Sequence, residues 1–173
     1  IPAAVPEGCF AKDGGVSKKF IQLSDWFDGL KKIRPYFGGG TGPFPREIFE
    51  RVEALLPELF AEDDIRLMHG DFHHYNILSS ERGWLVIDPK GVIGPAGYEI
   101  GPLMVNPFGI LMDRNRFKVQ TERRVDIIRE RTGWAREKII SWALAHSVLS
   151  AYWDLDLDPT ETIEMAKIFS SLK

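Results

Sequence analysis

Residues 65–91 read IRLMHGDFHHYNILSSERGWLVIDPKG, and the rest of the chain is expected to fold around this segment. It opens with a short apolar run at 65–68, which predicts a strand, and the polar residues after it predict a loop. Two further apolar runs, 77–79 and 84–87, flank residues 80–83, whose composition is typical of a turn, so they predict a β-hairpin. Three of the four histidines lie in the polar loop. Because loops at strand ends commonly carry chemistry, this segment is the candidate site.

Asp71, Asn76 and Asp88 carry oxygen donors that suit magnesium-dependent phosphoryl transfer. Mg²⁺ usually binds one or two protein carboxylates together with waters and substrate phosphates. An aspartate, an asparagine five positions later and a second aspartate after a hairpin match the catalytic and metal loops of phosphoryl-transfer enzymes. In that order Asp71 orients the attacking hydroxyl, while Asn76 and Asp88 hold the metal. The alternative is an ordinary polar turn, since Asp and Asn favour turns, but it leaves Asp88 and the histidines unexplained.

The two loops also carry a family resemblance. His69-Gly70-Asp71-Phe72-His73-His74-Tyr75-Asn76 and Ile87-Asp88-Pro89-Lys90-Gly91 resemble the catalytic and metal loops of the aminoglycoside phosphotransferases, which are kinase-like enzymes that phosphorylate antibiotic hydroxyls. The strings GPAGYEIG at 94–101, Asn106-Pro107 and WALAHSVLSAYW at 142–153 are similar to the branch that contains streptomycin 6-kinase and hydroxyurea-resistance kinases. The resemblance covers residues 45–155. It implies an ATP- and Mg-dependent phosphotransferase with an alcohol group as acceptor, acting on an aminoglycoside-type antibiotic or a related small molecule.

Outside this segment the sequence predicts mostly helix, and therefore an α+β, mainly α fold. The expected helices start at a Ser24 cap and stop before Pro35, start at Pro45 with a kink or break at Pro57, and then cover 98–104, 121–132, 135–155 and 160–172. Residues 135–155 are apolar on almost every side, which is typical of a central helix. Asp158, Pro159 and Glu161 predict the cap, first residue and capping-box acid of the last helix.

The resemblance implies that residues 1–173 are the helical C-terminal catalytic lobe of a protein-kinase-like fold, with the small β-hairpin at its active site. Residues 1–22 are expected to be a loosely ordered lead-in. The sequence shows neither a strand-rich N-terminal nucleotide-binding lobe nor its motifs, and it begins without Met, so the chain is expected to be a fragment. Its missing lobe is then a partner, and the isolated fragment is expected to be inactive.

Composition limits the remaining classes. The chain has 173 residues, 44% of them hydrophobic, and a net charge of −3, which is ordinary for a globular domain and gives no basic surface for nucleic acid. A single cysteine excludes an intramolecular disulfide framework. No apolar run is long enough to span a bilayer, and the first residues do not resemble a signal peptide. The expected location is the cytoplasm, without membrane or nucleic-acid partners.

Further residues of the loop have candidate roles. His73 follows Asp71 by two residues, where many kinase-like loops place a basic residue near the γ-phosphate, and a structural hydrogen bond within the loop is the alternative. His69 and His74 are expected to be donors that orient the loop. The resemblance implies that Glu99, in the pair Tyr98-Glu99, supports the catalytic loop through backbone N–H groups, although Asp is commoner there.

Two other classes of function remain open. A metal-dependent hydrolase would use His69, Asp71, His73 and His74 as ligands, but it needs further ligands from distant loops. His146, the remaining histidine, lies in an apolar helix and is expected to be a hydrogen-bonded core residue. A non-catalytic kinase-like binding module is the other class, and the intact set of oxygen donors argues against it.

The acceptor is the least determined part of the hypothesis. Asp154 and Asp156 follow the central helix and are candidates for an acidic lip that binds a cationic aminoglycoside. The alternative is a solvated acidic loop that caps the next helix. The sequence does not choose between them.

Overall fold

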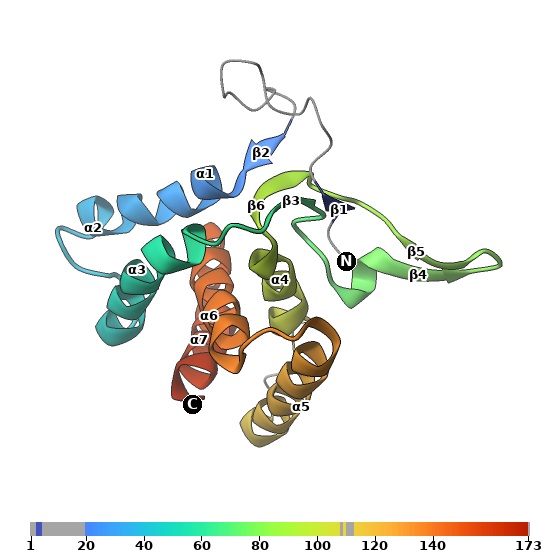
Figure 1. Cartoon of the computed structure of the whole chain (residues 1–173). Coiled ribbons are helices and arrows are strands. Elements are labelled where there is room, and N and C mark those ends of the chain that lie inside the picture. The colour runs from blue at the N-terminus through green and yellow to red at the C-terminus, as the bar shows by residue number, and fades with distance from the viewer. Residues whose placement is uncertain (1–2, 5–19, 108, 110–112, 173) are drawn as a thin grey trace, which may run out of the picture.

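The computed structural model describes residues 3–4, 20–107, 109 and 113–172, and this part of the chain is mainly helical with two small sheets, which confirms the predicted α+β class (Figure 1). The elements in chain order are β1 (Ala3–Ala4), β2 (Ile21–Gln22), α1 (Leu23–Phe27), η1 (Asp28–Lys32), α2 (Ile33–Tyr36), α3 (Arg46–Phe60), β3 (Ile65–Met68), η2 (His74–Asn76), β4 (Ile77–Ser80), β5 (Gly83–Val86), β6 (Val92–Pro95), η3 (Ala96–Glu99), α4 (Ile100–Val105), α5 (Arg114–Thr132), α6 (Arg136–Trp153) and α7 (Thr160–Ser171).

Helix α6 is the centre of the core, as its apolar sequence predicts. It contacts α3, α4, α5 and α7, and Figure 1 shows it running between these helices. Twelve of its thirteen residues from Ile139 to Ala151 are buried, so no face of the helix is exposed to solvent over this length. A helix that is apolar all round is stable only when other elements cover every side, and here they do.

The first helical region differs from its prediction. Ser24 is not the cap, because α1 begins at Leu23 after Gln22, and Pro35 lies inside α2 rather than after the helix. Pro35 is tolerated because it stands in the first turn of α2, where backbone N–H groups have no partner within the helix. Phe27 and Ile33 are buried, so this region packs one apolar face against the core.

Two predicted boundaries of α3 were also wrong. Pro45 is the residue before the helix rather than its first residue, and of the predicted kink or break at Pro57 the break does not occur, because α3 continues to Phe60. Pro57 removes one backbone hydrogen bond, but Val52 and Leu59 are buried on either side of it, and tertiary packing decides the conformation here.

The later helices begin and end partly as predicted. Helix α5 starts seven residues earlier than expected, where the carboxylate of Asp113 accepts a hydrogen bond from the backbone N–H of Arg116 at 2.9 Å, and it ends at Gly133 as predicted. Before α7, Asp158 accepts from the N–H of Thr160 at 3.0 Å. Glu161 is not a capping-box residue, because its carboxylate accepts from the N–H of Gly109 at 2.6 Å.

The structure contains a four-stranded sheet that is separate from the hairpin predicted by the sequence. Its order is β1-β3-β6-β2, with β3 antiparallel to β1 and β6, and β2 parallel to β6. Strand β6 was not predicted. Strands β1 and β2 fall within 1–22, so the expected loose lead-in is wrong at residues 3–4 and 21–22, while 1–2 and 5–19 lie outside the described residues.

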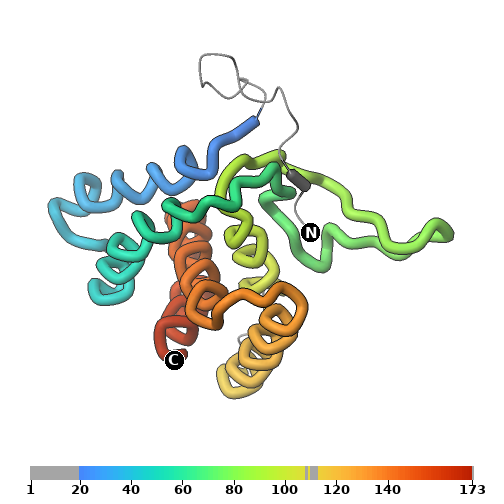
Figure 2. The backbone as a smooth tube through the Cα atoms, in the orientation of Figure 1, coloured from blue at the N-terminus to red at the C-terminus, as the bar shows by residue number. Residues whose placement is uncertain are grey.

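The pairing of β3 with β6 positions the candidate site. Met68 at the end of β3 lies opposite Val92 at the start of β6, so the loop after β3 and the segment before β6 leave the sheet side by side. Between them the chain forms the predicted β4–β5 hairpin, which projects away from the helices (Figure 2). The sheet thus brings Asp71 and Asp88 together although the hairpin separates them in sequence.

Glycines in the 94–101 string allow η3 and α4 to pack closely on α6. A Cβ on Gly97 would lie 2.2 Å from Nε1 of Trp142, and a Cβ on Gly101 would lie 2.6 Å from Cβ of His146. Such distances are too short for any larger residue without movement of α6. The two glycines therefore keep Tyr98 and Glu99, which lie between them, close to α6, and Glu99 bonds to the loop that follows β3.

Candidate active site

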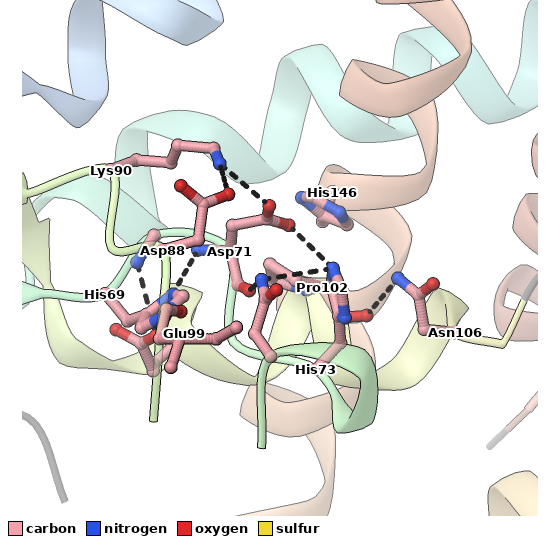
Figure 3. A network of polar contacts seen from close by, with 12 residues as sticks. His69, Asp71, His73, Asp88, Lys90, Glu99, Pro102, Asn106 and His146 are labelled. Carbon is pink, nitrogen blue, oxygen red and sulfur yellow. Dashed lines mark hydrogen bonds and ion pairs between the residues drawn. The ribbon is translucent and has the colours of Figure 1, made fainter. Parts of the chain in front are cut away.

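His69 ties the two loops of the candidate site together (Figure 3). Its Nε2 donates a hydrogen bond to the carbonyl of Ile87 at 2.7 Å, and its Nδ1 accepts one from the N–H of Asp71 at 3.2 Å. The His69 carbonyl in turn accepts from the N–H of Lys90 at 2.7 Å. Because both ring nitrogens are occupied within the loops, His69 orients the backbone and has no free nitrogen for a metal.

The carboxylate of Asp71 lies between two nitrogen donors. Oδ1 is 3.3 Å from Nε2 of His73, and Oδ2 is 3.3 Å from Nζ of Lys90. The side chain is one-third exposed. A half-buried carboxylate held from both sides is well oriented, and it still reaches the adjoining cavity.

Asn76 and Asp88 are the two predicted metal ligands, and the backbone N–H of Ile87 donates to the Asn76 carbonyl at 3.0 Å, which joins their segments. The amide nitrogen of Asn76 donates to the backbone carbonyl of Asp71 at 2.9 Å, so the opposite amide oxygen is the atom that can bind a metal. Asp88 has a φ of 56°, which is unusual for a residue other than glycine, and its side chain is exposed. Lys90 donates to that carboxylate at 2.6 Å and holds the pKa of Asp88 below its usual value.

Glu99 lies beside the loop that follows β3, which carries Asp71. Its Oε1 accepts a hydrogen bond from the N–H of Gly70 at 3.2 Å. Gly70 has a φ of 79°, and a Cβ there would lie 2.5 Å from Cγ2 of Val92, so glycine is required at this turn. Burial raises the pKa of Glu99, and the hydrogen bond from Gly70 opposes that effect.

His146 is a buried residue with a hydrogen-bond partner, as predicted. Its Nδ1 lies 3.0 Å from the hydroxyl of Tyr98, which is fully buried. Burial lowers the pKa of His146 to about 3 and raises that of Tyr98 well above its usual value, so both groups are neutral near pH 7. The neutral imidazole accepts from the tyrosine hydroxyl, and this pair links η3 to α6.

A cavity of about 410 Å³ opens beside Asp71. Its walls come from α1, the two loops, α4 and α6, and the residues that line it are Trp26, Gly70, Asp71, His73, Lys90, Val105, Asn106, His146, Ser150 and Trp153. The rings of Trp26 and Trp153 meet edge to face with centroids 5.3 Å apart. The cavity is therefore aromatic on one side and polar on the side of Asp71, a combination that suits a small molecule with hydroxyl groups.

The two acidic candidates do not lie in this cavity. Asp156 lines a neighbouring cavity of about 470 Å³, together with Lys32, Tyr36 and Tyr152, and Trp153 belongs to the walls of both cavities. Asp154 lines neither, and partial burial raises its pKa. Only Asp156 is thus placed where a ligand extending past Trp153 would meet it.

The metallohydrolase alternative finds no support in the site. Across the described ranges there is no group of three or more His, Cys, Asp or Glu side chains that could hold a metal ion. Both nitrogens of His69 are engaged in hydrogen bonds, and the ring of His74 packs against Tyr75 with centroids 4.1 Å apart. A site built from Asn76, Asp88, waters and phosphates does not require such a group.

Sequence reasoning missed two features of the site. Lys90 contacts both candidate carboxylates. The sequence feature that could have indicated it is a basic residue two positions after Asp88. Trp26 and Trp153 line the cavity, and no sequence pattern distinguishes a tryptophan in a core from one that lines a cavity.

Comparison with known proteins agrees with this geometry. The model of the aminoglycoside/hydroxyurea antibiotic resistance kinase family matches residues 10–157, and the chain belongs to this family. It is 35% identical to a streptomycin 3''-kinase of Klebsiella pneumoniae over 55% of this chain and 37% of that protein. It is 28% identical to a streptomycin 6-kinase of Streptomyces glaucescens, over 68% of this chain and 40% of that protein. It is 34% identical to a hydroxyurea phosphotransferase of Kitasatospora aureofaciens, over 64% of this chain and 31% of that protein.

The chain spans about a third of the length of these curated relatives. No solved structure matches it significantly. Among the helices of the described residues, none is long and apolar enough to cross a membrane.

Proposed function

We propose that this chain is the catalytic lobe of an ATP-dependent kinase that phosphorylates a hydroxyl group of an aminoglycoside-type antibiotic or a related small molecule. One observation carries the proposal: Asp71 lines a cavity of suitable size, while Lys90 joins its carboxylate to that of Asp88 and the Asn76 amide bonds to its backbone carbonyl. Membership of a family of antibiotic resistance kinases supports it. A non-catalytic binding module would not need these three side chains to converge.

Asp71 acts on the acceptor hydroxyl. Its carboxylate accepts a hydrogen bond from that hydroxyl and orients the oxygen toward the γ-phosphorus of ATP. As the new O–P bond forms and the bond to the leaving ADP breaks, the hydroxyl proton passes to Asp71. A carboxylate is a weak base, so the main contribution of Asp71 is orientation and late proton acceptance in a loose transition state.

The donors of Asn76 and Asp88 fit Mg²⁺. An amide oxygen and a carboxylate are hard ligands, and the Lys90 ammonium already on Asp88 shows that this carboxylate accepts a cation. Bound there, Mg²⁺ would neutralise charge on the nucleotide phosphates. The protein's part is to hold the two donors in adjacent segments, which the hydrogen bond between Ile87 and Asn76 does.

His73 contributes to the phosphate side of the site. Its Nε2 contacts Asp71, and its buried Nδ1 has no hydrogen-bond partner among the residues that the structure describes. A buried polar atom without a partner is unfavourable, and a phosphate oxygen can supply one to a protonated ring. His69 and Glu99 touch no substrate in this proposal, because both bond only to the loop backbone.

Two features support a two-lobed enzyme in which residues 1–173 form the C-terminal lobe and a nucleotide-binding lobe lies elsewhere in the protein. The chain matches only about a third of each relative. In addition, the hairpin and the segment after it expose large apolar side chains, namely Leu78, Trp84, Val86 and Ile87. Trp84 and Val86 alternate along β5 and so share one face of the hairpin, and exposed large apolar side chains on one face are typical of an interface. ATP bound by one lobe alone lacks alignment, so the isolated lobe should be inactive.

The acceptor is tested by a panel of compounds. A protein that contains this chain and a nucleotide-binding lobe is incubated with Mg-ATP and streptomycin, other aminoglycosides, hydroxyurea or simple sugars, and phosphorylated products are detected by ³¹P NMR. We expect one class to be phosphorylated well above the rate of ATP hydrolysis. Dependence on Asp156 but not Asp154, measured with Asp156→Asn and Asp154→Asn, would show that a cationic acceptor extends past Trp153. Hydrolysis of phosphoesters that requires Zn²⁺, without transfer from ATP, would contradict the proposal.

A further inference from the structure

The proposed reaction assigns no role to the ion pairs that Lys90 forms with the two candidate carboxylates. Its ammonium lies 2.6 Å from Oδ2 of Asp88 and 3.3 Å from Oδ2 of Asp71, so one cation joins the two candidate carboxylates (Figure 3). Asp71 belongs to the loop after β3, and Asp88 belongs to the segment before β6. The ion pairs therefore bridge the two halves of the active site.

The backbone of Lys90 is fixed as well as its side chain. Its N–H donates to the carbonyl of His69 at 2.7 Å, and its side chain, 39% exposed, lines the cavity beside Asp71. Single exposed ion pairs contribute little, because water screens them and long side chains lose entropy. Lys90 differs because it neutralises two like charges that converge on one point, and its backbone is already ordered.

We propose that Lys90 is a positioning residue that occupies the place of the divalent cation when no metal is bound. The ammonium keeps Asp71 and Asp88 converged despite their like charge. A divalent cation that binds Asp88 must displace it from that carboxylate, and the ammonium then stays with Asp71 at the edge of the cavity. The inference rests on the proposed metal site at Asn76 and Asp88, but not on the identity of the acceptor.

Binding of Mn²⁺ to the 173-residue chain, without nucleotide, tests this inference. Free Mn²⁺ is measured by electron paramagnetic resonance for the wild type, Lys90→Met and Lys90→Arg, and circular dichroism confirms that each variant is folded. Lys90→Met should bind Mn²⁺ at least about 5-fold more tightly than the wild type, since removal of one unit charge at ~4 Å has an effect of that size even in water. Lys90→Arg keeps the charge and should stay within about 2-fold of the wild type.

Two controls locate the effect. Lys118→Met removes an exposed lysine of α5 and should leave Mn²⁺ affinity unchanged. Adding Asp88→Asn to Lys90→Met should abolish the gain. Without metal, Lys90→Met should also melt at a lower temperature than the wild type, and Mn²⁺ should reduce that difference.

The outcomes separate the two proposals. If Lys90→Met binds Mn²⁺ equally or more weakly than the wild type, the role of Lys90 is overturned. The metal site stays in place in that case if Asp88→Asn abolishes Mn²⁺ binding. Absence of Mn²⁺ binding in every variant would overturn the role of Lys90, and the metal site would then be tested by repeating the titration with ATP present. Tighter binding that survives Asp88→Asn would place the metal elsewhere and would also overturn the inference.

Discussion

The carboxylate of Glu99 accepts a hydrogen bond from the backbone N–H of Gly70 at 3.2 Å, and this contact joins η3 to the first turn of the catalytic loop. Gly70 directly precedes Asp71, so the support acts one residue away from the proposed base. The contact is buried, and Oε2 of Glu99 has no partner among the described residues. Glu99 therefore positions the loop from below, and it is suited to do so without touching a substrate.

Glu99→Ala should have a larger effect on the stability of the fold than on substrate binding. The substitution leaves the N–H of Gly70 unpaired in a buried place, which costs on the order of 1–3 kcal/mol of the free energy of unfolding. Urea denaturation of the variant and the wild type measures this loss. Glu130→Ala, which changes an exposed glutamate of α5, is the matched control and should be neutral. An unchanged melting temperature together with lost substrate binding would show that Glu99 is a substrate ligand instead.

Glu99→Gln should change how stability depends on pH. Burial raises the pKa of Glu99 in the folded state above its ordinary value of 4.5. The folded wild type thus holds the proton more tightly than the unfolded chain, so this contribution to stability is complete below pH 4.5 and is lost as the pH rises through the raised pKa. The glutamine keeps an acceptor for Gly70 and does not titrate. The wild type should therefore lose stability relative to Glu99→Gln as the pH rises above 4.5, and a constant difference in denaturation experiments would contradict this.

Tyr98→Phe should destabilise the fold through His146. The hydroxyl of Tyr98 is the partner of the His146 Nδ1, and both residues are buried. Its removal leaves a buried acceptor unpaired, at a cost of about 1–3 kcal/mol. Chemical denaturation measures the change, and Tyr36→Phe is the control because Tyr36 is 78% exposed. If the two variants are equally stable, the pair does not contribute to the link between η3 and α6.

The isolated 173-residue chain should fold but should not transfer phosphate. Its core around α6 includes Trp142, Leu144 and Leu149, all fully buried, and it is available without another lobe. Mg-ATP titration and an assay with aminoglycosides, run beside a longer protein that includes the nucleotide-binding lobe, measure both properties. Turnover by the isolated chain that equals the longer protein would contradict the two-lobed architecture.

The candidate site could be predicted largely because its residues are close in sequence. Asp71, Asn76 and Asp88 lie within one segment, and their order and spacing indicate phosphoryl transfer before any tertiary contact is known. The hairpin and the central helix could likewise be predicted from the spacing of apolar residues and from composition. Lys90 could not be assigned from sequence, because its role depends on the pairing of β3 with β6, which brings Asp71 within its reach.

Two of the errors in the fold share one physical cause. Strand β6, in the Gly- and Pro-containing stretch 92–95, exists because β3 pairs with it and not because of its own propensity. Helix α3 passes Pro57 because packing outweighs one lost hydrogen bond. The first turns of α5 are charged and have no apolar period, so its start depends on the Asp113 cap. For β6 and α3 tertiary contacts override the local signal, whereas the start of α5 depends on a local cap.

Turnover of Asp71→Asn tests the central claim most directly. In a protein that carries both lobes, this variant keeps the size of the side chain and removes its ability to accept the hydroxyl proton. With Mg-ATP and the phosphorylated acceptor, kcat should fall by at least ~10², a typical contribution of a general base, while the KM for Mg-ATP changes little. The matched Asp63→Asn variant, at an exposed position before β3, should be fully active. Turnover of Asp71→Asn near that of the wild type would contradict the assignment of Asp71 and with it the proposed mechanism.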